Sequence, residues 1–221
     1  MRQFHLKIIL KRDATFGRGD GVAGLVDTEV MYDDLGLPYL GGRAIKGILV
    51  NECADILAAL PNDSRKEKWL AAAARLFGSP GSTEKEQSIL SMGDARLPEE
   101  IRTMIALGGM TPADVLETLT AIRQQTALEE SGVYKEHSLR TQRVILRETP
   151  LIARILFLEK PTSDDLALLH ACIKSFRRAG TSRNRGLGLL EAIFLDQTYQ
   201  AIPDDRYYWG FRSDYMKEGS K

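Results

Sequence analysis

The sequence contains few of the residues that mark a disulfide-stapled, zinc-binding or membrane-spanning protein. Its 221 residues include two cysteines and three histidines, and none of these stand at the spacing of a zinc site. Cys53 and Cys172 each lie within an apolar helical pattern, which favours two buried thiols over a disulfide. No apolar run approaches the roughly 18 residues that cross a bilayer, and the charged N-terminal stretch is not typical of a signal peptide. We therefore expect a cytoplasmic protein without a membrane partner.

Net charge is also lacking, because 30 basic residues balance 30 acidic ones. This balance argues against a protein that coats nucleic acid nonspecifically. The charges are nevertheless segregated along the chain, since no acidic residue lies between Asp165 and Glu191. That stretch contains five basic residues, namely Lys174, Arg177, Arg178, Arg183 and Arg185. Three arginines also lie in an acid-free stretch further upstream, namely Arg140, Arg143 and Arg147. The sequence therefore permits a local basic surface on a neutral protein.

Hydrophobic periodicity predicts alternating strands and helices. Strands are expected at residues 4–10, 88–97, 150–160 and 189–195. Helices are expected between Pro38 and Pro61, at about 64–76, from Thr111–Pro112 onward, and from an N-cap at Ser163 or Asp164 to Gly180. Residues 123–141 are polar and lack clear periodicity, so we expect an extended excursion such as a hairpin.

This order of elements predicts an α+β protein with a ferredoxin-like β-α-β-β-α-β core. We expect one domain over residues 1–200, with insertions at about 61–87 and 98–148. Residues 201–221 are charged and aromatic and are expected to form a C-terminal tail. A fold of this class does not by itself indicate a function.

The stretch "GGRAIKG", residues 41–47, combines two glycines with two cations at the start of a predicted helix. Arg43 and Lys46 are neighbours on one helix face. The helix dipole disfavours cations in the first turn. An anion such as a phosphate at the helix end would explain their presence, and a solvated helix face is the alternative.

A second basic motif, "RNRGLG" at residues 183–188, lies between a predicted helix and a predicted strand. This order is the reverse of a dinucleotide-binding fingerprint, and the motif lacks the G-K-[ST] of a Walker loop. Its polar side chains, Arg183, Asn184 and Arg185, can follow a nucleic-acid backbone. The alternative is a tight turn with exposed arginines.

Four motifs together resemble the CRISPR-associated RAMP superfamily. They are "LPYLGGRAIKGIL", "RLFGSP", "ILSMGDARL" and "RNRGLGLLEAIFL", which occur in the family's order. The resemblance covers most of residues 5–196 and is closest to the backbone subunits of type III effector complexes. It implies an RRM-like core, and the polar excursion resembles the thumb that such subunits place between guide and target RNA.

The resemblance also implies roles for individual residues. It places five residues on the guide CRISPR RNA, namely Arg43, Lys46, Arg183, Asn184 and Arg185. Arg140 is expected to contact RNA near the thumb. "VDTEV" is similar to the segment that carries the cleaving aspartate, which places catalysis of target-RNA cleavage on Asp27. A carboxylate can take a proton or bind a divalent metal such as Mg²⁺. Other subunits of a type III complex are the expected protein partners.

Departures from the family pattern leave two alternatives open. Glu29 stands where cleaving relatives commonly have proline, and Gly-Gly-Arg-Ala replaces a common Pro-Gly-Ser-Ser. The first alternative is a structural RNA-binding subunit that does not cleave. The second is a guide-processing endoribonuclease with His137 as general base; the other histidines, His5 and His170, are expected to be packing residues. Asp33 and Asp34 are expected in a turn before Gly36.

Overall fold

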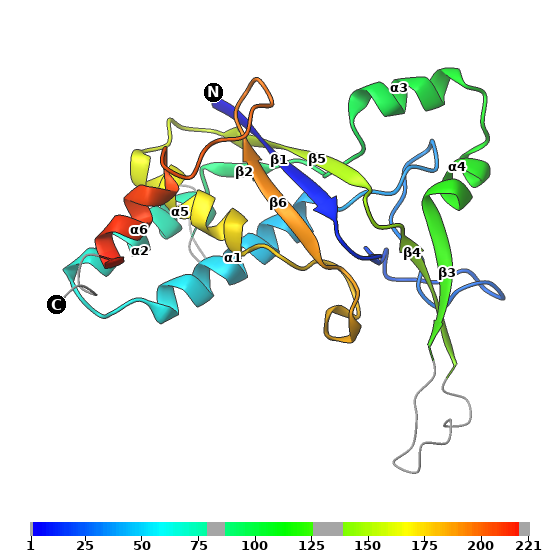
Figure 1. The fold of residues 1–221 in the computed structure, drawn as a ribbon, viewed down its shortest axis with the longest axis horizontal. Helices are drawn as coiled ribbons and strands as arrows, with labels where there is room; N and C mark the ends of the chain where they lie inside the picture. The colour runs from blue at the N-terminus through cyan, green and yellow to red at the C-terminus, as the bar shows by residue number, and fades with distance from the viewer. Residues whose placement is uncertain (1, 79–86, 126–138, 217–221) are drawn as a thin grey trace, which may run out of the picture.

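The structure is a computed structural model that describes residues 2–78, 87–125 and 139–216. Its centre is a four-stranded antiparallel sheet with the order β2-β5-β1-β6. The strands are β1 (Arg2–Leu10), β2 (Leu90–Met92), β5 (Pro150–Phe157) and β6 (Leu190–Leu195). Helices α1 (Gly42–Ala59) and α5 (Ser163–Ser175) lie beside the sheet (Figure 1). The α+β class is confirmed. The strands of this sheet and the two helices follow along the chain as β1, α1, β2, β5, α5 and β6, with other elements inserted between them.

Alternation along the strands explains why the helices cover one face of the sheet. In β1, Leu6, Ile8 and Leu10 are fully buried, because alternate side chains point toward the helices. Ile45 and Leu49 of α1 belong to the same core cluster and are also fully buried. The other face of the sheet is left open to further contacts.

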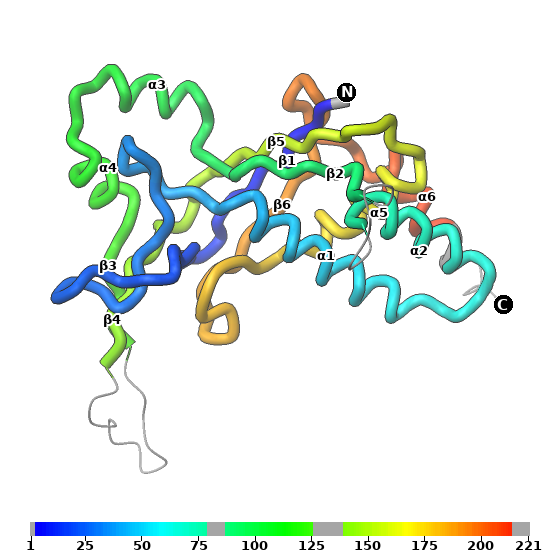
Figure 2. Tube along the Cα trace, turned by 180° about the vertical axis from the view of Figure 1, so that it is seen from behind, coloured from blue at the N-terminus to red at the C-terminus, as the bar shows by residue number. Residues whose placement is uncertain are grey.

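Two more helices extend the helical layer at one end of the molecule (Figure 2). Helix α2 (Ser64–Phe77) begins after the N-cap Asp63, as its predicted bounds suggest. Helix α6 (Tyr208–Met216) packs against α5, and the ring of Phe211 lies 4.9 Å from that of Trp69. Part of the expected C-terminal tail is therefore a helix that covers the core.

The opposite end consists of the segment between β2 and β5. It contains α3 (Glu99–Leu107), α4 (Pro112–Leu119) and a two-stranded sheet of β3 (Thr120–Gln125) and β4 (Arg140–Ile145). The expected polar excursion is thus a hairpin at its base. Residues 126–138, including His137, lie outside the described residues.

The structure corrects several predicted boundaries. The strand expected at 88–97 is confined to β2, and the helix expected to end at Gly180 ends at Ser175. The N-cap of α5 is Thr162, whose hydroxyl accepts from the N–H of Asp165 while the Asp165 carboxylate accepts from the N–H of Thr162. This reciprocal capping box makes Thr162 a better cap than Ser163 or Asp164. Helix α3 was not predicted.

Two other predictions from composition and turn chemistry are confirmed. Cys53 and Cys172 are buried and free of disulfides. Asp33 forms the expected turn, since its Oδ1 accepts from the N–H groups of Leu35 and Leu37 at 3.0 and 3.2 Å. Over the described ranges, every helix is too short or too polar to traverse a bilayer.

Candidate nucleic-acid interface

The first turn of α1 is built around a carboxylate from the same chain. The N–H of Gly42 donates to Oδ1 of Asp94 at 2.9 Å, and Arg96 donates to Oδ2 at 2.9 Å. Burial alone would raise the pKa of Asp94, but the hydrogen bonds from Gly42 and Arg96 outweigh it and the pKa is lowered. The anion at the N–H of Gly42 is therefore Asp94 of the same chain, and phosphate binding beside Arg43 and Lys46 stays a prediction.

The glycine and the lysine of this turn also serve contacts within the chain. A Cβ atom on Gly42 would lie 2.2 Å from the carbonyl oxygen of Met92, so glycine allows α1 to approach β2. The Lys46 ammonium donates to Ser88 Oγ at 2.7 Å and to the carbonyl oxygen of Leu90 at 3.0 Å. Burial lowers the pKa of Lys46. Contact of Lys46 with RNA stays a prediction, and it would require exchange of these two hydrogen bonds.

Arg43 and Gly47 lie one turn apart on the exposed face of α1. A Cβ atom on Gly47 would meet nothing within 4 Å, so packing inside the described chain does not require glycine there. Glycine in a helix interior costs about 1 kcal/mol relative to alanine. The bare backbone at Gly47 therefore suits a surface that another molecule approaches closely.

The glycine-rich turn forms a basic cavity beside α1. The turn contains the short 3₁₀ helix η2 (Arg183–Arg185). The cavity has a volume of about 290 Å³ and is lined by Glu52, Ser175, Arg177, Arg178, Arg183 and Asn184. Burial and Asp55 raise the pKa of Glu52, and Arg183 opposes them. Three arginines against one carboxylate leave a positive surplus that suits a phosphate group.

Two of the three predicted RNA-binding residues in this turn line the cavity. Arg183 and Asn184 line it, whereas Arg185 is exposed outside it. Arg177 and Arg178 were not among the predicted binding residues. The acid-free stretch of the sequence was the signal that could have identified them, because a surplus of one charge over a short span usually marks a surface.

Close backbone contacts fix the turn that carries Arg183. A Cβ atom on Gly188 would lie 2.0 Å from the carbonyl oxygen of Ala179. One on Gly180 would lie 2.4 Å from the carbonyl oxygen of Thr15. Ser182, directly before η2, has a φ of 56°, which is an uncommon conformation for a residue with a side chain. The arginine side chains are thus displayed from a tightly packed backbone.

The loop between β1 and α1 connects the glycine-rich turn to the β3–β4 hairpin. A Cβ atom on Gly17 would lie 3.4 Å from Thr28 of the same loop and 3.8 Å from Thr181 of the glycine-rich turn, so the loop packs against this turn. The carbonyl oxygen of Thr28 accepts from the N–H of Arg143 in β4 at 3.0 Å. Figures 1 and 2 show α1, η2, this loop and the hairpin base in succession along one edge of the molecule.

Asp27 lies where this loop meets the hairpin. Its Oδ2 accepts from the N–H of Thr141 at 2.7 Å, and its own N–H donates to the carbonyl oxygen of Thr141 at 2.8 Å. The exposed Asp27 side chain borders a cavity of about 330 Å³ formed with residues 21–26 and Thr141. Arg140 precedes Thr141 in the chain and is also exposed. Asp27 and Arg140 are therefore both exposed near the base of the hairpin.

Glu29 anchors the Asp27 loop through a buried ion pair. Only 1% of Glu29 and 7% of Arg143 is exposed. Nε of Arg143 donates to both carboxylate oxygens of Glu29 at 2.9 and 3.1 Å, and the N–H of Val30 donates to Oε1 at 2.8 Å. Nη1 of Arg143 donates to Thr120 Oγ1 at 3.2 Å. The departure from proline at Glu29 thus has a structural role.

The described surroundings of Asp27 offer fewer than three of the side chains that usually bind a divalent metal. In the part of the chain that the structure describes, no three His, Cys, Asp or Glu side chains cluster around a possible metal position. Magnesium in proteins commonly uses one or two carboxylates and keeps several water ligands. Within the described residues, Asp27 therefore fits a site with one or two protein carboxylates and not a closed cage of protein ligands.

Two of the three histidines pack inside the chain, as expected. His5 is 2% exposed and its ring stacks on Tyr199, while His170 is 3% exposed and its ring lies 5.6 Å from that of Phe194. His137 lies outside the described residues, so its proposed role in guide processing stays a prediction.

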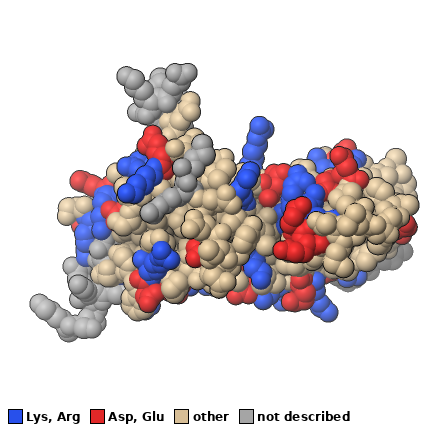
Figure 3. Space-filling view, turned by 90° about the horizontal axis from the view of Figure 1, so that it is seen from above, with Lys and Arg blue, Asp and Glu red and all other residues tan. Residues whose placement is uncertain are grey.

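Charge on the face shown in Figure 3 is mixed. Basic and acidic side chains are interspersed there and do not gather into one broad patch. This distribution fits a net charge of zero. The surplus of positive charge at the η2 cavity is local, as the segregated sequence suggested.

Comparisons with known proteins agree with this architecture. Residues 13–191 match the family model described as RAMP superfamily. One similar solved chain comes from "Cryo-EM structure of the Type III-B Cmr-beta bound to cognate target RNA", with a TM-score of 0.62 and 12% identity, covering 88% of this chain and 97% of that one. Another comes from "Type III-B Cmr-beta Cryo-EM structure of the Apo state", with a TM-score of 0.64 and 12% identity, covering 89% and 98%. The comparison with curated proteins finds no match.

Proposed function

The chain belongs to the RAMP superfamily, and on this basis we propose that it is an RNA-binding subunit of a type III CRISPR effector ribonucleoprotein. Its fold is similar to that of chains in type III-B Cmr-beta assemblies, one of which is bound to cognate target RNA. The guide CRISPR RNA, the target RNA and the other subunits of the complex would be its partners.

The observation that carries the RNA-binding proposal is the η2 cavity, where Arg177, Arg178 and Arg183 outnumber Glu52. Arginine forks match the oxygens of phosphate groups. Contacts to phosphate fix the position of a nucleic acid without reading its bases. A guide RNA must be held regardless of its sequence, so this type of contact is the appropriate one.

The exposed face of α1 would continue the guide path. Arg43 supplies a cation there, and Gly47 leaves the helix backbone uncovered. From α1 the path would pass η2 and reach Arg140 at the hairpin base. Lys46 would join only if its hydrogen bonds to Ser88 and Leu90 were exchanged.

We further propose that Asp27 takes part in cleavage of the paired target RNA. Attack by a ribose 2′-oxygen on the adjacent phosphate requires removal of the hydroxyl proton. Oδ2 of Asp27 is held by the N–H of Thr141, while the side chain remains exposed beside a cavity. Asp27 can therefore accept the proton from a fixed position. A Mg²⁺ ion bound at this carboxylate would supply positive charge to the reacting phosphate.

A structural subunit without cleavage activity is the second candidate. Two observations favour it. No three metal-ligating side chains cluster at Asp27 among the described residues, and the buried Glu29–Arg143 pair shapes the loop. In that case Asp27 would serve only to connect the loop to Thr141. Guide binding at η2 is common to both candidates, so it can be tested first.

The test of the shared proposal is binding of a labelled guide RNA over a range of salt concentrations. Arg183→Ala should weaken binding by a similar factor for guides of different sequence and reduce the magnitude of the salt slope by about 0.7, the value for one phosphate of a single strand. Lys160→Ala is the matched control, because Lys160 is an exposed cation in the β5–α5 connection, remote from η2. Unchanged affinity of Arg183→Ala, or weakening for some guide sequences only, would contradict the proposed contact.

A further inference from the structure

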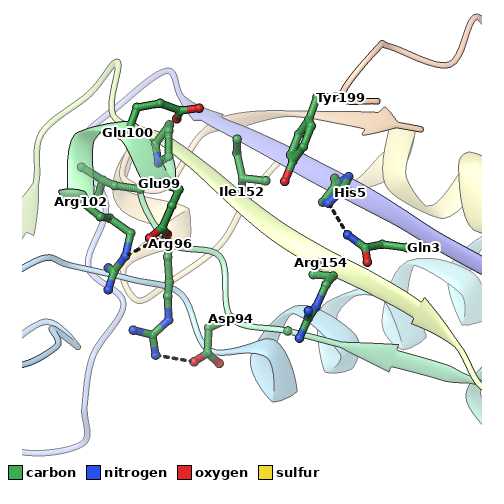
Figure 4. A pocket seen from close by; sticks show the side chains of 13 residues that line it. Gln3, His5, Asp94, Arg96, Glu99, Glu100, Arg102, Ile152, Arg154 and Tyr199 are labelled. Carbon is green, nitrogen blue, oxygen red and sulfur yellow. Dashed lines mark hydrogen bonds and ion pairs between the residues drawn. The ribbon is translucent and has the colours of Figure 1, made fainter. Parts of the chain in front are cut away.

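A cavity of about 560 Å³ lies on the face of the four-stranded sheet opposite α1 and α5 (Figure 4). Alternation places it there, because Leu6 and Ile8 of β1 point into the helix-covered core while Gln3 and His5 point to the other side. Its volume falls in the range of about 300–1,000 Å³ that is typical of ligand pockets. Because the cavity lies on this opposite face, it is separate from the edge of the molecule that carries η2 and Asp27.

An aromatic platform borders this cavity. The rings of His5 and Tyr199 stack with centroids 4.0 Å apart and an angle of 17° between planes. His5 is held in place by hydrogen-bond contacts to Gln3 at 2.9 Å and to the carbonyl oxygen of Asp196 at 3.1 Å. Tyr199 remains 55% exposed. Its backbone has a φ of 62°, so an uncommon backbone conformation presents this ring to the cavity.

One cation of the cavity lacks a partner. Arg96 pairs with Asp94 at 2.9 Å and with Asp33 at 3.2 Å, and Arg102 pairs with Asp33 at 2.6 Å. Arg154, in contrast, makes no ion pair or side-chain hydrogen bond with any of the described residues. It lies directly across from His5 in the β1–β5 ladder. Arg154, His5 and Tyr199 thus form a row across the open face, with the apolar Ile152 beside them (Figure 4).

We propose that this cavity binds one nucleotide of single-stranded RNA, with its base stacked on Tyr199 and its phosphate at Arg154. The site combines the two groups that sequence-tolerant RNA binding needs, which are an exposed aromatic face and a cation. The inference rests on the proposed function in that RNA is the assumed partner. It adds a second contact on another face of the chain.

The acidic side chains at the rim of the cavity favour single-stranded RNA over a duplex. Glu99 and Glu100 stand at the rim on the α3 side, and Glu99 is paired with Arg102 at a distance of 3.7 Å. Their carboxylates would repel the closely spaced phosphates of a duplex laid across the cavity. A single unstacked nucleotide that enters from the Arg154 side avoids this repulsion, so the geometry favours a single strand.

The experiment uses the full chain and an eight-nucleotide RNA that contains 4-thiouridine. Photo-crosslinking followed by mass spectrometry should place a crosslink on the peptide that contains Tyr199. Tyr199→Ala should weaken binding by roughly tenfold, since stacking of one base on an aromatic ring contributes about 1–3 kcal/mol. Tyr199→Phe keeps the ring and should bind nearly as the wild type does. Arg154→Ala should reduce the magnitude of the salt slope by about 0.7, the value for one phosphate of a single strand.

The outcomes separate this inference from the proposed function. A crosslink at Tyr199 that persists in Arg183→Ala would support two independent RNA contacts. Weakening by Arg183→Ala without any effect of Tyr199→Ala would overturn the inference and leave the guide-binding proposal intact. If adenosine monophosphate binds as tightly as the RNA, the ligand of the cavity is a free nucleotide. If only another subunit, and not RNA, shields Tyr199, the ligand of the cavity is a protein. Either of these two results would also overturn it.

Discussion

Substitution of Arg143 by alanine should strongly destabilise the protein, because it would leave the Glu29 carboxylate buried without its counter-ion. The pair is joined by two hydrogen bonds of 2.9 and 3.1 Å and is almost completely removed from water. Unit charges about 4 Å apart interact by about 4 kcal/mol at an effective dielectric constant near 20. Removal of one partner from a buried pair costs about 3–5 kcal/mol. Such a loss is a large fraction of the 5–15 kcal/mol that is typical for unfolding.

Urea unfolding and thermal melting of the purified chain would measure this effect. For a chain of this length the melting temperature should fall by roughly 10 °C. Arg147→Ala is the control, since Arg147 is an exposed arginine just past the same strand, and it should change the free energy of unfolding by less than about 0.5 kcal/mol. Arg143→Met combined with Glu29→Gln should be less destabilised than Arg143→Ala, because it leaves no buried charge. A loss below about 1 kcal/mol for Arg143→Ala would refute the reasoning.

Two further predictions concern the exposed face of α1 and the contact between α5 and α6. Gly47→Ala should raise the free energy of unfolding by up to about 1 kcal/mol, and yet weaken guide binding because a methyl group would obstruct RNA at the helix backbone. Urea unfolding measures the first effect and fluorescence anisotropy with labelled guide RNA measures the second. Equal or tighter guide binding would count against the proposed guide path. Burial lowers the pKa of His170, with Lys174 contributing and Asp204 opposing, so the unfolded chain takes up a proton first as pH falls below about 6.5. Wild type should therefore lose more stability than His170→Gln between pH 7.5 and 5.5 in urea unfolding, and equal losses would contradict the role of His170.

The elements with strong apolar periodicity could be predicted from the sequence. Helices α1, α2 and α5 bury regular apolar positions such as Ile45, Leu49 and Leu169, and the strands β1, β5 and β6 are rich in buried aliphatic residues. Helix α3 could not be predicted in this way, because it buries none of its residues and exposes 73% of Met104 and 83% of Leu107. Its apolar residues Ile101, Met104 and Ile105 do recur at helical spacing, but the helix has only nine residues. That is shorter than the window of about 11 residues or more over which such a pattern becomes a clear signal.

The segments that carry the candidate site residues could be recognised from the sequence, but their contacts within the chain could not. The "VDTEV" and "RNRGLG" motifs identified the segments around Asp27 and Arg183, which the structure places along one edge. The pairing of Glu29 with Arg143 joins residues 114 positions apart, and that of Gly42 with Asp94 joins residues 52 positions apart. Periodicity and local spacing report neighbours within a few residues, so these long-range contacts leave no trace in them.

Cleavage of target RNA by the guide-loaded assembly, with wild type compared against Asp27→Ala, tests the central claim most directly. The reactions would be run with Mg²⁺ and with a chelator, and RNA binding would be measured on the same samples. We predict that Asp27→Ala abolishes cleavage while binding of guide and target is retained, and that the chelator has the same effect on wild type. Cleavage that is equal in wild type and Asp27→Ala, or absent from both, would contradict a catalytic role for Asp27 and leave the chain as a structural RNA-binding subunit.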